Sequence, residues 1–236
     1  MKTKFKHILV ILCLSMISCE GNLEPELFDQ ITPENFLTNE DDVKTAVTGV
    51  YAEFRGISEW GRYKTSWGSV MTLQEVPTDL WAANWFYKAH TDFMWKATDY
   101  FVCEIFEFFV PAITKATALI ARIQDAPVSD DIKNRYIAEL RVVRALWMYD
   151  LFDLYGPVPA ITDPEKILNP TQDFTVTRPS REEYITFVET ELKEVINAKI
   201  LPVAWTGSDY GHVSQATAMM VLLQLYTVSY THLRAH

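Results

Sequence analysis

The stretch of sequence that decides the fold reads AELRVVRALWMYDLFDLYGPVPAIT and spans residues 138–162. In this stretch and just before it, apolar side chains recur at spacings of three and four residues, which is typical of a helix with one face packed inward. The members of this stripe are Ile132, Tyr136, Leu140, Val143, Trp147, Leu151 and Leu154. Ser129 is a suitable N-cap residue, and the Gly-Pro-Val-Pro run at 156–159 cannot continue a helix. The sequence therefore predicts a long helix that begins after Ser129 and ends at about residue 155.

Four more long helices are predicted outward from this one, at residues 39–56, 99–123, 180–198 and 214–226. Asn39 and Ser180 are N-cap residues, and Glu183 completes a capping box with Ser180. Pro111 lies inside the second of these helices, where we expect it to kink or split the helix. A short helix is also expected to begin at Thr32. Because no convincing run of strands appears, the sequence predicts an all-α fold, either a bundle or a solenoid of helical hairpins.

The first 19 residues, MKTKFKHILVILCLSMISC, have the layout of a secretory signal, with three lysines before an apolar run. The run is too short to span a bilayer, which needs roughly 20 apolar residues. It ends at Ser18 and Cys19, a pair that resembles the lipobox of bacterial lipoproteins, in which the cysteine becomes the lipidated first residue. We therefore expect residues 1–19 to be a signal peptide, Cys19 to be lipidated and the acidic residues 20–31 to form a tether. A plain signal peptide without lipidation is the alternative.

Net charge and motifs argue against several classes of function. The formal net charge is −10, which disfavours binding to a phosphate backbone, so no nucleic-acid partner is expected. Between the signal and the last nine residues only His90 and His212 remain, and no paired metal-ligand motif or nucleophile elbow is present. His90 is interpreted as a loop or core histidine. We therefore expect no catalytic residue, no metal and no cofactor. A carboxylate pair of a glycoside hydrolase is the alternative, although nothing marks two of the 31 acids as a pair.

Aromatic residues are concentrated between residues 60 and 109, where the chain has 14 of its 31. In the segment WAANWFYK, residues 81–88, they lie among small and polar residues without helical periodicity, as is usual for rings on loops. An aromatic face suits the C–H face of a sugar ring, and nearby polar side chains such as Asp79 can bind hydroxyl groups. We therefore predict a glycan-binding site at Trp81, Asn84, Trp85 and Tyr87. Packing of the same rings in the core is the alternative.

The segment 138–162 resembles the signature of the SusD/RagB family, the glycan-binding lipoproteins of starch-utilisation-type systems. The family pattern runs roughly Ala-Glu-x-Arg-x-x-Arg-Ala and then an aromatic-rich turn that ends Leu-Tyr-Gly-x-Val-Pro. Here it is met by Ala138, Glu139, Arg141, Arg144, Ala145, Tyr149, Leu154, Tyr155, Gly156, Val158 and Pro159. Segments at residues 32–55, 178–196 and 211–226 are similar to further parts of the family in the same order, although Ser214 stands where the family often has Thr. The resemblance covers nearly all of the body, and the signature itself indicates a fold and not a site.

The resemblance implies an all-α fold of tetratricopeptide-like helical hairpins with long decorating loops, incomplete at the C-terminus. It implies an outer-membrane lipoprotein, exposed on the cell surface, that captures oligosaccharides and delivers them to a TonB-dependent, SusC-like transporter without cleaving them. In the family, the glycan-contacting aromatic residues come from loops in about the region of Trp81 to Trp95. A structural lipoprotein or adaptor, with all its aromatic residues in the core, is a further alternative.

The end of the chain differs from the rest. Residues 228–236, VSYTHLRAH, do not continue the helix pattern that precedes Tyr226, and they look like one reading frame of a transposase-based sequencing adapter. We therefore expect residues 32–226 to be the N-terminal part of a longer SusD-like domain and residues 227–236 to be a non-native tail without function. We also expect the fragment to expose apolar surface and to aggregate readily. A natural basic tail is the alternative, and sequencing of the source locus across codon 227 distinguishes the two.

Overall fold

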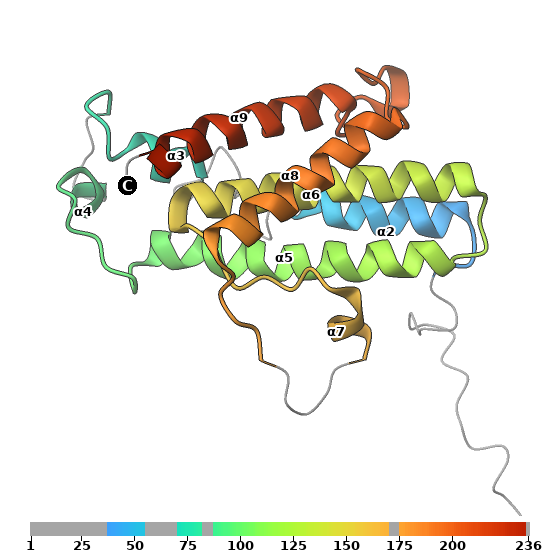
Figure 1. Ribbon diagram of the computed structural model, residues 1–236, viewed down its shortest axis with the longest axis horizontal. Coiled ribbons are helices and arrows are strands. Elements are labelled where there is room, and N and C mark those ends of the chain that lie inside the picture. The colour runs from blue at the N-terminus through green and yellow to red at the C-terminus, as the bar shows by residue number, and fades with distance from the viewer. Residues whose placement is uncertain (1–36, 55–69, 82–86, 170–174, 235–236) are drawn as a thin grey trace, which may run out of the picture. The chain divides into compact units, whose positions relative to one another are not determined.

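Helix α6 (Asp130–Tyr155) lies at the centre of the fold and contacts four other long helices (Figure 1). They are α2 (Glu40–Ala52), α5 (Tyr100–Asp125), α8 (Arg181–Ala198) and α9 (Gln215–Arg234). The computed structural model describes residues 37–54, 70–81, 87–169 and 175–234, with side chains up to residue 228. Its contacts divide the chain into residues 1–36 and 37–236, and every described residue belongs to the second unit. The helix expected at Thr32 therefore lies outside the described residues.

The bounds predicted for α6 are confirmed, but its burial is more extensive than a single stripe. Gly156 ends the helix with a φ of 72°, a left-handed value that favours glycine, and its N–H donates to the carbonyl of Phe152 at 2.9 Å. Five residues of the predicted stripe are buried, and so are several residues between them, including Glu139 and Arg144. Because helices pack on more than one side of α6, its C-terminal half has almost no solvent face.

The polar residues of the 138–162 segment are held in buried ion pairs. The carboxylate of Glu139 is fully buried and accepts from Tyr51 Oη at 2.8 Å and Arg135 Nε at 3.0 Å. The oxygen that accepts from Tyr51, Glu139 Oε2, also lies 2.7 Å from His212 Nδ1. Arg144 donates to the carboxylate of Glu191 on α8 and to Thr117 Oγ1 on α5, the latter at 2.9 Å. These residues tie α2, α5, α8 and the segment before α9 to α6, which agrees with the expectation that the 138–162 segment indicates the fold.

Helix α5 continues through Pro111, so the expected split is wrong. The helix is unbroken from Tyr100 to Asp125, and Pro111 lies on its exposed face. A proline removes the bond to the carbonyl four residues earlier, which here belongs to Glu107, also exposed. The freed carbonyl is therefore on the solvent side, and the buried side chains of Phe109 and Ile113 hold both halves of the helix against the core. A four-residue connection joins α5 to α6, and the two helices form a hairpin.

The predicted capping box of α8 is confirmed. Ser180 Oγ accepts from the N–H of Glu183 at 3.2 Å, and the Glu183 carboxylate accepts from the N–H of Ser180 at 2.8 Å. The Ser180 hydroxyl also donates to the Glu183 carboxylate at 2.7 Å, and this hydrogen bond, together with the one from the Ser180 N–H, holds the pKa of Glu183 below its ordinary value. Asn39 caps α2 in the same way, because its side chain accepts from the N–H of Asp42 at 3.0 Å.

Replacing Ser180 by alanine is expected to lower the free energy of unfolding by about 1 kcal/mol, since a donor at the start of α8 loses its acceptor. Equilibrium urea unfolding measures the effect. Ser208→Ala, in the exposed 3-10 helix η2 (Gly207–Asp209), is the control and should change stability by less than about 0.5 kcal/mol. Equal effects of the two changes would contradict a stabilising role of the capping box.

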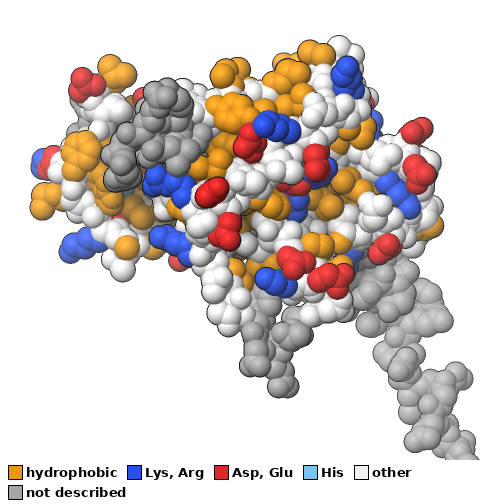
Figure 2. All heavy atoms as spheres, viewed as in Figure 1, with side chains coloured by type: hydrophobic (Ala, Val, Ile, Leu, Met, Phe, Trp, Pro, Cys, Tyr) orange, Lys and Arg blue, Asp and Glu red, His pale blue; other side chains and the backbone are white. Residues whose placement is uncertain are grey.

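Helix α9 runs from Gln215 to Arg234, so the expected end at Tyr226 is wrong. Residues 227–234 contain no glycine or proline, and nothing in their sequence stops a helix that has already started. Residues 227–236 being a non-native tail stays a prediction. One face of α9 is buried, while Met219, Met220 and Leu223 are exposed, and Figure 2 shows hydrophobic side chains gathered along this helix.

The other described elements are short. They are α3 (Val70–Glu75), α4 (Lys88–Thr91), α7 (Pro164–Leu168) and η2. No strand occurs in residues 37–54, 70–81, 87–169 or 175–234. Within these same ranges, none of the helices has the length and apolar character needed to cross a membrane.

Candidate functional site

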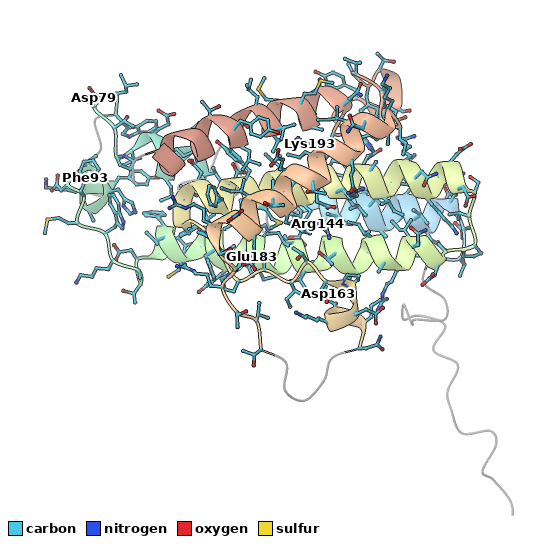
Figure 3. The ribbon with its side chains drawn as sticks, in the orientation of Figure 1. Asp79, Phe93, Arg144, Asp163, Glu183 and Lys193 are labelled. Atoms are coloured by element: carbon cyan, nitrogen blue, oxygen red, sulfur yellow. The ribbon has the colours of Figure 1, made fainter. Side chains whose placement is uncertain are left out.

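Exposed hydrophobic side chains lie at the end of the molecule that carries α3 and α4 (Figures 1 and 2), and several of the exposed aromatic residues belong to the segments there. Trp81 and Trp95 are each 42% exposed, and Phe93 and Tyr100 are each 67% exposed. In Figure 3, Phe93 and Asp79 lie at this same end, at the outer edge of the structure. We call Trp81, Phe93, Trp95 and Tyr100 the aromatic surface. Rings of this size are normally buried, so their exposure together marks a candidate binding surface.

A tight turn after α4 presents Phe93 to solvent. The N–H of Met94 donates to the carbonyl of Ala89 at 2.7 Å, and Phe93 has a left-handed φ of 55°. This conformation is unusual for a bulky residue and costs on the order of 1–3 kcal/mol. Farther along, Asp99 Oδ2 accepts from the N–H of Lys96 at 2.8 Å and leads the chain into α5. The loop between α4 and α5 is therefore held by its own hydrogen bonds.

A cavity of about 360 Å³ lies beside Trp95, between the loop and the helices. Its lining is mainly apolar and consists of Leu73, Pro77, His90, Trp95, Ala97, Val102, Leu154 and Tyr155. Tyr155 Oη donates to the carbonyl of Val102 at 2.7 Å, and burial raises the pKa of Tyr155, so this phenol stays protonated. The cavity is lined on one side by Leu154 and Tyr155 at the end of α6 and also by Trp95, which belongs to the aromatic surface.

His90 forms part of the wall of this cavity and is 5% exposed. Its ring stacks on Trp95, with centroids 6.0 Å apart and planes 16° apart, and meets Phe101 edge-on at 5.6 Å. Neither ring nitrogen has a hydrogen-bond partner among the residues that the structure describes. Burial lowers the pKa of His90, an effect that the charge of Asp99 partly opposes. The imidazole is therefore neutral at pH 7, with one nitrogen as a donor and the other as an acceptor.

The structure describes two of the four predicted site residues, Trp81 and Tyr87, and they differ in exposure. Trp81 is exposed, whereas Tyr87 is half-buried, with its ring 5.2 Å from that of Phe101, and burial raises the pKa of Tyr87. Asn84 and Trp85 lie outside the described residues, so a shared face of Trp81 and Trp85 stays a prediction.

Four residues of this region were missed as site residues by reasoning from the sequence. They are His90, Phe93, Trp95 and Tyr100. The interpretation of His90 as a core histidine is correct as far as its burial is concerned. A signal for Phe93 and Trp95 was present, because they follow WAANWFYK in the same stretch without periodicity. The position of His90 against Trp95 depends on the turn at Phe93, which no sequence pattern predicts.

The described residues do not meet the requirements of a metal site, and they contain one thiol, that of Cys103. Among the described residues, no three side chains of His, Cys, Asp or Glu are grouped so that they can hold a metal ion. Cys103 is half-buried, and its thiol donates to the carbonyl of Ala97 at 3.0 Å.

Comparisons with known proteins identify relatives by sequence and by fold. No family model matches the chain. A SusD-like protein of Formosa agariphila is 25% identical over 203 residues, which are 81% of this chain and 37% of that protein. This chain therefore spans little more than a third of the length of that relative.

Solved structures share the fold. Surface glycan-binding protein A of Bacteroides uniformis superposes with a TM-score of 0.67 at 16% identity, over 83% of this chain and 43% of that protein. A laminarin-binding SusD-like protein gives a TM-score of 0.62 at 22% identity, over 84% of this chain and 42% of that protein. The chain is therefore similar in sequence to a SusD-like protein, and it shares its all-α fold with solved SusD-like and surface glycan-binding proteins.

Proposed function

We propose that this chain is the glycan-binding part of a longer surface lipoprotein and that it binds oligosaccharides at the aromatic surface. The observation that carries the proposal is the group of exposed rings beside a cavity, on loops held by a rigid set of helices. Flat apolar rings stack on the C–H faces of sugars, and the hydrogen bonds of the loop between α4 and α5 keep Phe93 and Trp95 in place without a ligand. The names of the relatives support the same ligand class, since one binds laminarin and another is a surface glycan-binding protein.

The proposal extends to transport. A lipid on Cys19 would hold the protein at the outer membrane, and bound oligosaccharide would pass to a TonB-dependent, SusC-like transporter. The family resemblance supports this part, together with the signal-like first 19 residues. Co-purification with a SusC-like barrel from native membranes tests it, and recovery of the protein without any barrel would count against it.

The two alternatives fit the described geometry less well. A structural adaptor needs its aromatic residues in the core, whereas Trp81 and Trp95 are each 42% exposed. A glycoside hydrolase canonically needs two carboxyl groups across the scissile bond. The described lining of the cavity beside Trp95 contains no acidic side chain. At this cavity the geometry favours binding over hydrolysis.

Replacing Trp81 or Trp95 by alanine is expected to weaken oligosaccharide binding by about 1–3 kcal/mol, because each change removes an exposed ring that stacks on sugar. Isothermal titration with laminarihexaose, maltohexaose and xylohexaose measures the change. The melting temperature should stay within about 2 °C for the Trp81 variant and fall further for the Trp95 variant, because Trp95 also packs on the buried His90. Tyr210→Ala is the matched control, because Tyr210 is an exposed ring (83%) between α8 and α9. Equal affinity of the tryptophan variants and the control would contradict the proposed site.

Replacing Cys19 by alanine is expected to release the protein from membranes, because the acyl chains would be lost together with their attachment site. Partition into detergent and labelling with a fatty-acid analogue measure the change. Cys103→Ala is the control and should leave both readouts unchanged. Unchanged labelling of the Cys19 variant would contradict lipidation at Cys19, and absence of label from the wild type would show that the first 19 residues are a plain signal peptide.

A further inference from the structure

We propose that the cavity beside Trp95 is a subsite for one neutral sugar residue and that His90 binds a hydroxyl group of that residue. This inference rests on the proposed function and makes it more specific. In this proposal the oligosaccharide chain lies along the aromatic surface, and one of its sugar residues turns inward and enters the cavity.

The size and the lining of the cavity fit one neutral sugar residue. A volume of about 360 Å³ lies near the lower limit of ligand pockets, which range from about 300 to 1,000 Å³. One wall is the ring of Trp95, which is also part of the aromatic surface, so a glycan chain can reach both places. The described lining contains no Lys, Arg, Asp or Glu. A carboxylate or sulfate group on the sugar would therefore lose its hydration without gaining a cation.

His90 is the polar group in this lining whose nitrogens have no described partner. Both nitrogens are covered in the structure, so hydrogen bonding to a sugar hydroxyl group requires a local shift of the cavity wall. The hydroxyl of Tyr155 already donates to the carbonyl of Val102, whereas neither ring nitrogen of His90 has a partner among the described residues. Leaving a buried polar group without a hydrogen bond destabilises a fold. The stack on Trp95 and the edge contact with Phe101 fix the orientation of the imidazole. A hydroxyl group is both donor and acceptor, and a neutral imidazole offers one of each.

His90→Phe separates recognition from packing. Phenylalanine keeps a flat ring against Trp95 and Phe101 but removes both nitrogens. We expect the affinity for the hexasaccharide that the wild type binds best among laminarihexaose, maltohexaose and xylohexaose to fall about 3- to 10-fold, the effect of one neutral hydrogen bond. The melting temperature should rise by about 2–5 °C, because a buried polar group without a partner is removed. Met94→Ala, an exposed neighbour outside the cavity lining, is the control and should leave affinity unchanged.

The variants and ligands give each outcome a distinct meaning. No binding of any hexasaccharide by the wild type would overturn the proposed function. Wild-type binding with equal affinity in His90→Phe would overturn only the role of His90. If His90→Phe does not fold, the pair His90→Gln and His90→Leu replaces it, and equal affinity of these two variants would contradict hydrogen bonding. Tighter binding of hexagalacturonic acid than of all three neutral hexasaccharides would contradict a neutral subsite.

Discussion

Replacing Glu191 by leucine is expected to lower the free energy of unfolding by about 3–5 kcal/mol, because it leaves Arg144 buried without a counter-charge. The Arg144 side chain is 7% exposed and the Glu191 side chain 10% exposed, and their ion pair joins α6 to α8. The guanidinium also donates to Thr117 Oγ1 at 2.9 Å, but this hydroxyl carries no charge. Equilibrium urea unfolding measures the change.

Glu194→Leu is the matched control on the same helix. Glu194 contacts Arg141 at 2.5 Å, but its side chain is 59% exposed, so the expected loss is less than about 1 kcal/mol. The double variant Arg144→Met with Glu191→Leu should recover most of the stability, since no buried charge remains without a partner. A loss no larger for Glu191→Leu than for Glu194→Leu would contradict a structural role of the buried pair.

Replacing Glu139 by leucine is expected to have an effect of similar size, about 3–5 kcal/mol. The fully buried carboxylate contacts Tyr51 of α2, Arg135 of α6 and His212 before α9. Burial and the negative charge of Glu139 raise the pKa of Tyr51, so the phenol remains a donor to this carboxylate. Without Glu139, these donors lose their common acceptor.

Hydrogen exchange distinguishes this variant from a general loss of stability. We expect faster exchange in α2 and in residues 201–214 than in the hairpin of α5 and α6, because Glu139 connects the first two segments to α6. Glu107→Leu, at an exposed position of α5, is the control and should shift stability by less than about 0.5 kcal/mol. Exchange that rises equally in all helices would contradict a local connecting role.

Local signals in the sequence predict most helix bounds, because caps and stops act over a few residues. Asn39, Ser180 with Glu183, and Gly156 all lie at the predicted helix ends. The sequence predicts less well how far α5 and α9 extend, since α5 is not split at Pro111 and α9 does not end at Tyr226. Pro111 is tolerated because its side of α5 faces solvent, and α9 continues because no breaker follows Tyr226.

The buried charges could not be predicted from local patterns. Tyr51 is 88 residues from Glu139, and Glu191 is 47 residues from Arg144. No local pattern in the sequence distinguishes Glu139 and Glu191 among the 31 acids, yet both lie in the interior. Their partners come together only when the hairpins pack around α6.

The candidate site was predicted in part. The loss of periodicity around Trp81 predicts rings on loops, and Trp81 is exposed. The cavity and His90 were not predicted, because they depend on how the loop between α4 and α5 folds back against α3 and the end of α6. Such contacts between short elements leave no periodic signal in the sequence.

The most direct test of glycan binding at the aromatic surface is a crystal structure of the protein with the hexasaccharide that it binds best. We expect sugar rings to stack on Trp81 and Trp95, with one residue in the cavity and a hydroxyl group within hydrogen-bond distance of a ring nitrogen of His90. Electron density for the hexasaccharide elsewhere on the protein, with Trp81 and Trp95 free of sugar, would contradict the account.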